Sequence, residues 1–169
     1  LPVNYFRVAL AAMFGVLFQS NVMAADIDTS AEFAYVTDFA SGKVLMDKDP
    51  DSPMKPASMA KIMTVYVAFQ RIADGSLSLD DTFLISEKAW RKGGSKTFVE
   101  VGKQVAVRDL LMGVVVQSGN DAAIAIAEGI SGTEDGFAEE MNYVARQLGM
   151  NNTVFKNACL LYTSPSPRD

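Results

Sequence analysis

The chain has 169 residues, is 49% hydrophobic and carries a formal net charge of −5, which fits one globular domain preceded by an apolar leader. The acidic balance argues against a nucleic-acid partner, because phosphate binding needs clustered lysine and arginine. The sequence contains no histidine, which excludes every catalytic triad with an imidazole base. With Cys159 as the only cysteine, we expect no intramolecular disulfide, no metal site and no cofactor.

The first 24 residues have the layout of a secretory signal peptide. Arg7 precedes an apolar run from Val8 to Phe18, and the small-residue site Val22-Met23-Ala24 follows a short polar stretch. The run is shorter than the roughly 20 apolar residues that a membrane-spanning helix needs. We therefore expect cleavage after Ala24 and export of the protein.

Two strand-like segments open the rest of the chain, at residues 33–38 and 43–47. The residues between them, Phe39-Ala40-Ser41-Gly42, end in a glycine that can adopt the positive φ of a tight turn. The pattern predicts a β-hairpin.

A long helix is expected from about Ser58 to Asp74, with Gly75 as its C-terminal cap. Residues 62–69 are almost entirely apolar, so we expect this helix to be buried in the centre of the domain. Helical spacing places Ser58 and Lys61 on one face, with β-carbons about 5 to 6 Å apart. The lysine amine could then reach the serine hydroxyl, which is the arrangement of a serine nucleophile with a lysine base.

A Ser-x-x-Lys motif is weak evidence by itself, because the chain contains a second copy, Ser52-Pro53-Met54-Lys55. That copy holds Pro53 and is followed by Pro56, so it cannot lie on a helix. For the Ser58 copy, the alternative interpretation is a serine N-cap followed by an ordinary lysine.

A second motif, Ser118-Gly119-Asn120, connects two expected helices at residues 109–117 and 121–128. Turn chemistry and an N-cap could account for it alone. It is nevertheless the only Ser-x-Asn in the chain, and it begins 60 residues after Ser58.

The following segment predicts one more helix. Ser131 and Glu134 have the spacing of a capping box. An apolar stripe continues to Gly149 and is interpreted as core packing, through Phe137, Met141, Val144 and Leu148.

Three motifs of the chain have an informative order and spacing: Pro56-Ala57-Ser58-Met59-Ala60-Lys61, Gln117-Ser118-Gly119-Asn120-Asp121-Ala122 and Phe155-Lys156-Asn157-Ala158. Together they resemble the D-alanyl-D-alanine carboxypeptidases, which are low-molecular-mass penicillin-binding proteins of the bacterial envelope. The resemblance covers about residues 33–158. It implies an α+β, β-lactamase/transpeptidase-like fold in which helices flank an antiparallel sheet, with the active site between the sheet and the helical region.

The resemblance also implies roles for individual residues. Ser58 would be the nucleophile that attacks the penultimate D-alanine carbonyl of a peptidoglycan stem peptide, and Lys61 would be its general base. Ser118 would relay the proton to the leaving D-alanine, and Asn120 would bind the acyl-chain amide. β-Lactam antibiotics would be the other ligands, and the periplasm or the outer face of the bacterial cytoplasmic membrane would be the location.

The sequence departs from the family pattern in its last part. The family's Lys-Thr-Gly motif is absent, because Lys96-Thr97-Phe98 lacks the glycine and precedes Ser118. We expect residues 25–158 to be the N-terminal part of the catalytic domain. Residues 159–169 resemble translated adapter sequence. The later sheet strands and the C-terminal region that gives peripheral inner-membrane association would then be missing, and the fragment would be poorly stable and inactive.

Three alternatives remain open from the sequence. A DD-endopeptidase would use the same residues. A class A β-lactamase would need a glutamate followed four residues later by asparagine, and no glutamate in this chain has that neighbour. A wall-binding protein without catalysis is the third.

Overall fold

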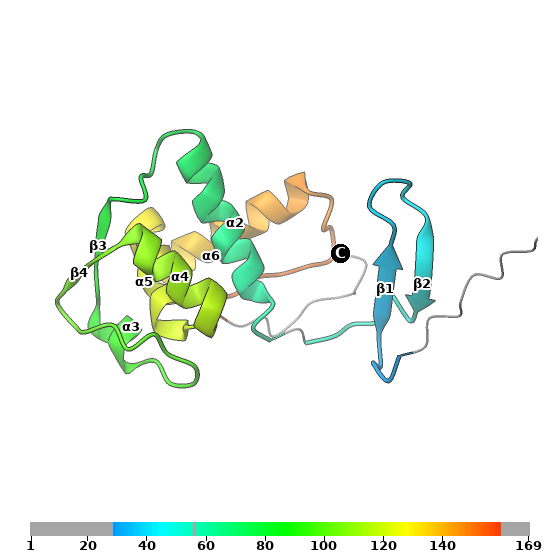
Figure 1. Ribbon diagram of the computed structural model, residues 1–169, viewed down its shortest axis with the longest axis horizontal. Coiled ribbons are helices and arrows are strands. Elements are labelled where there is room, and N and C mark those ends of the chain that lie inside the picture. Colours follow the sequence, from blue (N-terminus) through cyan, green and yellow to red (C-terminus); the bar gives the residue numbers. More distant parts are fainter. Residues whose placement is uncertain (1–28, 56, 160–169) are drawn as a thin grey trace, which may run out of the picture. The chain divides into compact units, whose positions relative to one another are not determined.

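The computed structural model describes residues 29–55 and 57–159 (Figure 1). The chain divides into two units, Leu1–Ser30 and Ala31–Asp169, and all the described helices and strands belong to the second. The expected signal peptide, Pro56 and residues 160–169 lie outside the described residues. No helix in the described ranges is long and apolar enough to cross a membrane.

The expected hairpin is confirmed. Strands β1 (Ala34–Thr37) and β2 (Val44–Lys48) pair antiparallel, with Ala34 opposite Lys48. Gly42 takes a φ of 69°, which a residue with a side chain adopts only at a cost. The hairpin is one of two two-stranded antiparallel sheets in the described part of the chain.

The second sheet was not predicted from the sequence. Strands β3 (Thr82–Leu84) and β4 (Gln104–Ala106) pair antiparallel. Helix α3 (Glu87–Arg91) lies between them in the chain and begins after Ser86, whose Oγ accepts a hydrogen bond from the Ala89 N–H. These elements are only three to five residues long, so they carry too few residues for a periodic pattern.

The central helix of the domain is α5 (Asn120–Ser131), and not the helix that follows Ser58. Its first eight residues are all buried, and alternating alanine and isoleucine let neighbouring helices approach from every side. Helix α4 (Val107–Gln117) leads directly into it. The expectation that the Ser58 helix occupies the centre is therefore wrong.

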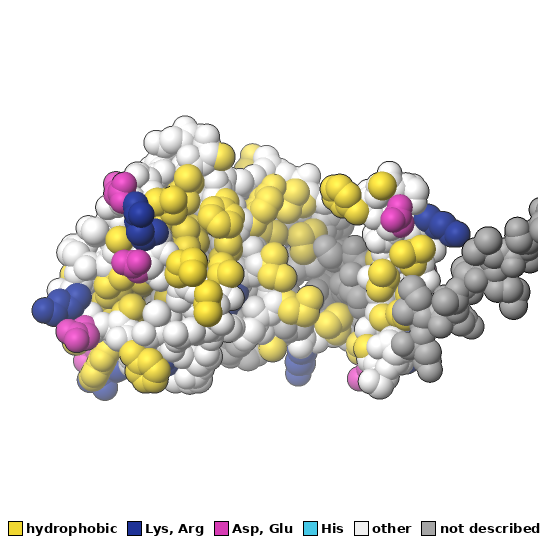
Figure 2. Space-filling view, in the orientation of Figure 1, with side chains coloured by type: hydrophobic (Ala, Val, Ile, Leu, Met, Phe, Trp, Pro, Cys, Tyr) yellow, Lys and Arg dark blue, Asp and Glu magenta, His cyan; other side chains and the backbone are white. Residues whose placement is uncertain are grey.

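Helix α2 (Ala60–Ala73) packs on this core through one face only. Ala60, Met63 and Val67 are buried, whereas Ile62 and Phe69 are 68% and 51% exposed. Apolar side chains of α2 and α4 therefore gather on the surface (Figure 2).

Helix α6 (Glu134–Gln147) closes the domain and carries the predicted apolar stripe. Phe137, Met141 and Val144 are buried, as expected. The prediction for Leu148 is wrong, because this residue is the C-cap of α6 and is 50% exposed. The predicted capping box is wrong, because Thr133 is the N-cap and its Oγ1 accepts the Gly136 N–H at 3.0 Å. Ser131 still belongs to α5, which runs three residues further than predicted.

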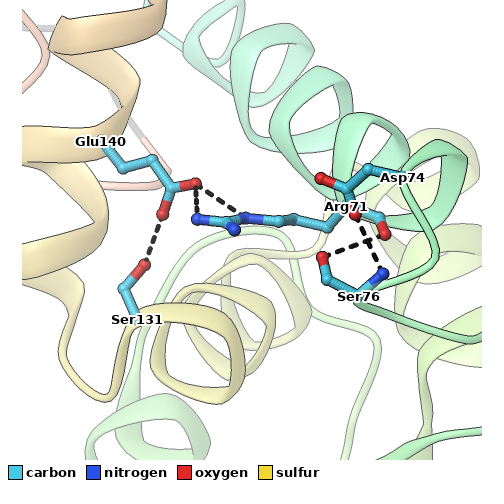
Figure 3. Close-up of polar contacts among 5 residues, drawn as sticks. All are labelled: Arg71, Asp74, Ser76, Ser131 and Glu140. Atoms are coloured by element: carbon cyan, nitrogen blue, oxygen red, sulfur yellow. Dashed lines mark hydrogen bonds and ion pairs between the residues drawn. The ribbon is translucent and has the colours of Figure 1, made fainter.

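A polar network joins the C-terminal end of α2 to α5 and α6 (Figure 3). Arg71 donates two hydrogen bonds to Glu140 Oε1, at 3.0 Å from Nε and 2.6 Å from Nη2. Ser131 Oγ donates to the other oxygen of Glu140 at 2.9 Å. Two open depressions of about 550 and 580 Å³ flank Arg71, and they contain none of the predicted site residues.

Candidate active site

Ser58 and Lys61 meet at the start of α2, as their spacing predicts. Ser58 lies two residues before the helix, in a turn closed by a hydrogen bond from the Lys61 N–H to the Ser58 carbonyl at 3.1 Å. Lys61 Nζ is 3.3 Å from Ser58 Oγ. The N-cap of α2 is Met59 and has no side-chain cap bond, so the interpretation of Ser58 as a simple helix cap is wrong.

The environment of Lys61 favours its neutral form. The side chain is only 4% exposed, and this burial lowers its pKa from the ordinary value of 10.5. Cys159 acts in the opposite direction, and the positive charge of Lys92 lowers the pKa further. A lysine can accept a proton only when it is neutral, so these effects suit a general base.

The segment around Cys159 runs along the same face of α2. Lys61 Nζ donates to the Cys159 carbonyl at 3.0 Å, and Thr64 Oγ1 donates to the Ala158 carbonyl at 2.7 Å. Cys159 is fully buried, although the sequence pattern assigns it to the segment outside the family resemblance. A backbone carbonyl can come from any residue type, so no sequence signal could have identified this contact.

The second motif is connected to the first motif by the segment around Cys159. Ser118 ends α4 in the left-handed conformation, with φ 54° and ψ 36°, and Asn120 is the first residue of α5. The Asn120 carbonyl accepts a hydrogen bond from Cys159 Sγ at 3.3 Å. Burial raises the pKa of the Cys159 thiol to about 12, so the thiol stays protonated and can donate. Cys159 thus contacts both Lys61 and Asn120.

The four predicted residues are not all in direct contact. The structure joins Ser58 to Lys61 directly, and Lys61 to Asn120 through Cys159. Ser118 is partly exposed, and its left-handed φ is a strain that is common at functional sites.

Asn120 has an unused hydrogen-bond acceptor. The residue is 6% exposed, and its Nδ2 donates to the Gly93 carbonyl at 2.8 Å. Its Oδ1 is buried and has no hydrogen-bond partner among the described residues. A buried acceptor without a hydrogen-bond partner costs free energy, which sets Asn120 Oδ1 apart from the paired Nδ2 of the same side chain.

Comparison with known proteins identifies the family of the chain. The family model described as D-alanyl-D-alanine carboxypeptidase (Peptidase S11) matches residues 19–164. The carboxypeptidase DacF of Bacillus subtilis is 38% identical over 139 residues, and the carboxypeptidase DacC of Escherichia coli K12 is 39% identical over 144 residues. Each match covers 82% of this chain and 36% of the relative.

The fold agrees as well. The crystal structure of the D-alanyl-D-alanine carboxypeptidase DacD from Francisella tularensis superposes with a TM-score of 0.82 at 40% identity, covering 87% of this chain and 36% of that one. The chain thus spans little more than a third of the length of these proteins. With its α+β fold of β-lactamase/transpeptidase type, this chain belongs to the D-alanyl-D-alanine carboxypeptidase family, Peptidase S11.

Proposed function

We propose that the complete protein is a serine-type D-Ala-D-Ala carboxypeptidase that removes the terminal D-alanine of peptidoglycan stem peptides and binds β-lactams. The observation that carries this proposal is the Ser58–Lys61 pair. The amine of a buried lysine with a lowered pKa lies 3.3 Å from the hydroxyl of an exposed serine, two residues before α2. An ordinary surface lysine would have neither the burial nor the partner.

In the first half of the reaction, Ser58 Oγ attacks the carbonyl carbon of the penultimate D-alanine, and its proton passes to the neutral Lys61 amine. The backbone N–H of Ser58 contributes to the site that stabilises the negative oxygen of the tetrahedral intermediate. Asn120 binds the acyl-chain amide.

The intermediate then collapses as the peptide C–N bond breaks. Ser118 relays the proton from Lys61 to the amine of the leaving D-alanine, and the acyl group stays on Ser58. Water attacks this ester, and its proton returns through the same groups, which releases the shortened stem peptide and restores Ser58.

The acyl-enzyme can be tested directly with benzylpenicillin. We expect the complete protein to gain one penicillin mass on the peptide that contains Ser58, and Ser58→Ala to abolish the adduct. Ser52→Ala is a matched control, because it removes the serine of the other Ser-x-x-Lys copy, which is not helical. An adduct that survives in Ser58→Ala would overturn the assignment of the nucleophile.

The choice among related activities follows from three further measurements. Release of free D-alanine from a linear stem pentapeptide supports the carboxypeptidase, whereas cleavage of a cross-linked dimer alone would indicate a DD-endopeptidase. Rapid turnover of penicillin would indicate a β-lactamase-like hydrolase. Failure to form any adduct would indicate a non-catalytic wall-binding protein.

We also propose that the complete protein is exported to the periplasm after removal of residues 1–24. Family membership supports this proposal, because the substrate lies outside the cytoplasmic membrane. In the full-length family, peripheral membrane association is expected to come from a C-terminal region. The N-terminal sequence of the mature protein tests cleavage after Ala24, and a resequenced gene tests whether residues 159–169 are an artefact.

A further inference from the structure

The second residue of α5 is an aspartate, Asp121, that the proposed reaction does not use. Its side chain is fully buried, and it accepts four hydrogen bonds from backbone N–H groups. Oδ1 accepts from Thr97 at 2.8 Å and from Ala122 at 2.9 Å. Oδ2 accepts from Phe98 at 2.9 Å and from Val99 at 3.3 Å.

Three of these four donors belong to one irregular stretch, Thr97–Val99. Burial of a carboxylate is costly unless hydrogen bonds replace its water. Because the donors are backbone groups of a stretch that precedes α4, Asp121 holds this stretch against the beginning of α5. We call residues 93–99, which include this stretch, the clamp segment.

The clamp segment is held in close and partly strained contact with the second motif. A Cβ added to Gly119 would lie 2.2 Å from Thr97 Oγ1 and 3.1 Å from the Thr97 backbone nitrogen, so a side chain at position 119 would collide with Thr97. Phe98 has a φ of +64°, a left-handed conformation that is unfavourable for a residue with a side chain. Its N–H donates to Asp121, which offsets that strain.

The same segment holds Asn120 at two points. The Asn120 N–H donates to the Ser95 carbonyl at 2.8 Å, and its Nδ2 donates to the Gly93 carbonyl at 2.8 Å. The orientation of the Asn120 amide, with its unpartnered Oδ1, therefore depends on where the clamp segment lies.

We propose that Asp121 is a positioning residue: its carboxylate fixes the clamp segment, and the clamp segment orients Asn120 toward the acyl-chain amide. This inference rests on the proposed function, since it needs Asn120 to bind that amide. Asp121 itself touches no reacting atom. Its contribution should appear only with ligands that carry the amide.

Two penicillins separate positioning from general loss of structure. Benzylpenicillin has an acyl-chain amide, whereas 6-aminopenicillanic acid has a free amine at the same position. In the complete protein, Asp121→Asn replaces one acceptor oxygen by an NH₂ group that faces backbone donors. We expect the ratio of the two acylation rates, benzylpenicillin over 6-aminopenicillanic acid, to fall at least about tenfold, as for the loss of a charged hydrogen bond.

Matched variants complete the test. Glu140→Gln makes the same acid-to-amide change in the Arg71 network and should leave the ratio unchanged. In an Asn120→Ala background, Asp121→Asn should change the ratio no further. An equal loss with both penicillins in Asp121→Asn would overturn the proposal, whereas absence of any adduct in the unsubstituted protein would overturn the proposed function instead.

A second route covers the case in which Asp121→Asn does not fold. Gly119→Ala keeps the carboxylate but pushes the clamp segment away, because the new Cβ collides with Thr97. We expect the same fall in the ratio. A folded Gly119→Ala protein with an unchanged ratio would contradict the positioning role.

Discussion

The ionisation of Lys61 is the residue-scale property on which the proposed chemistry depends. Burial lowers the pKa of Lys61 from 10.5. The neutral amine therefore becomes the main form once the pH exceeds this lowered pKa, which is below 10.5. We expect the rate of acylation by benzylpenicillin to rise with pH and to level off below pH 10.5. Stopped-flow or quenched mass measurements of the complete protein across pH give this profile.

Two lysine variants show whether the rise belongs to Lys61. Lys61→Met should abolish fast acylation and the rising limb, whereas Lys55→Met changes the lysine of the non-helical copy and should keep both. The free energy of unfolding should also increase with pH between the lowered pKa and 10.5, because only the unfolded chain binds the proton there. A rise in the acylation rate with its midpoint at or above pH 10.5 would contradict the assignment of Lys61 as the base.

At the scale of elements, the junction between α4 and α5 carries a strain that glycine would relieve. Ser118 has a φ of 54°, which costs about 1 kcal/mol or more for a residue with a Cβ. We expect Ser118→Gly to unfold at higher denaturant concentration than Ser118→Ala.

Both variants lack the hydroxyl, so D-alanine release should fall in both by about 10² to 10⁴, as for the loss of a proton-transfer group. Retained activity in Ser118→Ala would contradict the relay, and equal stability of the two variants would contradict the strain.

The sequence was sufficient to predict elements whose signal is local. The hairpin around Gly42 is confirmed, and so are the helices on either side of Ser118-Gly119-Asn120, with α4 beginning two residues earlier than predicted and α5 running from Asn120 to Ser131. The Ser58–Lys61 contact is confirmed too, because the turn that leads into α2 keeps these two residues on one side of the chain.

The sequence was insufficient where the outcome depends on neighbours far along the chain. An apolar composition could not say which of α2 and α5 lies in the centre, since both are rich in apolar residues. The capping box was misplaced because Ser131 and Thr133 are both suitable caps, and the actual end of α5 decides between them. The contacts of Lys61 with a backbone carbonyl and of Asp121 with backbone N–H groups depend on atoms that all residue types, or all except proline, carry.

At the scale of the whole molecule, the face drawn in Figure 2 carries an apolar surface on α2 and α4. Ile62 and Phe69 on α2, and Met112, Val115 and Val116 on α4, are between 51% and 68% exposed. A single exposed apolar side chain is ordinary, whereas a group of this size on adjoining helices favours association.

We therefore expect the chain from Ala25 onward to bind the dye ANS and to self-associate as its concentration rises. Replacing Ile62 and Val116 together by glutamine should reduce dye binding and shift sedimentation toward the monomer, because it places polar groups on both helices of this face. Tyr143→Gln is a matched control, since Tyr143 is 65% exposed but lies on α6. A monomeric chain that binds no dye, or an equal effect of Tyr143→Gln, would show that this face does not drive association.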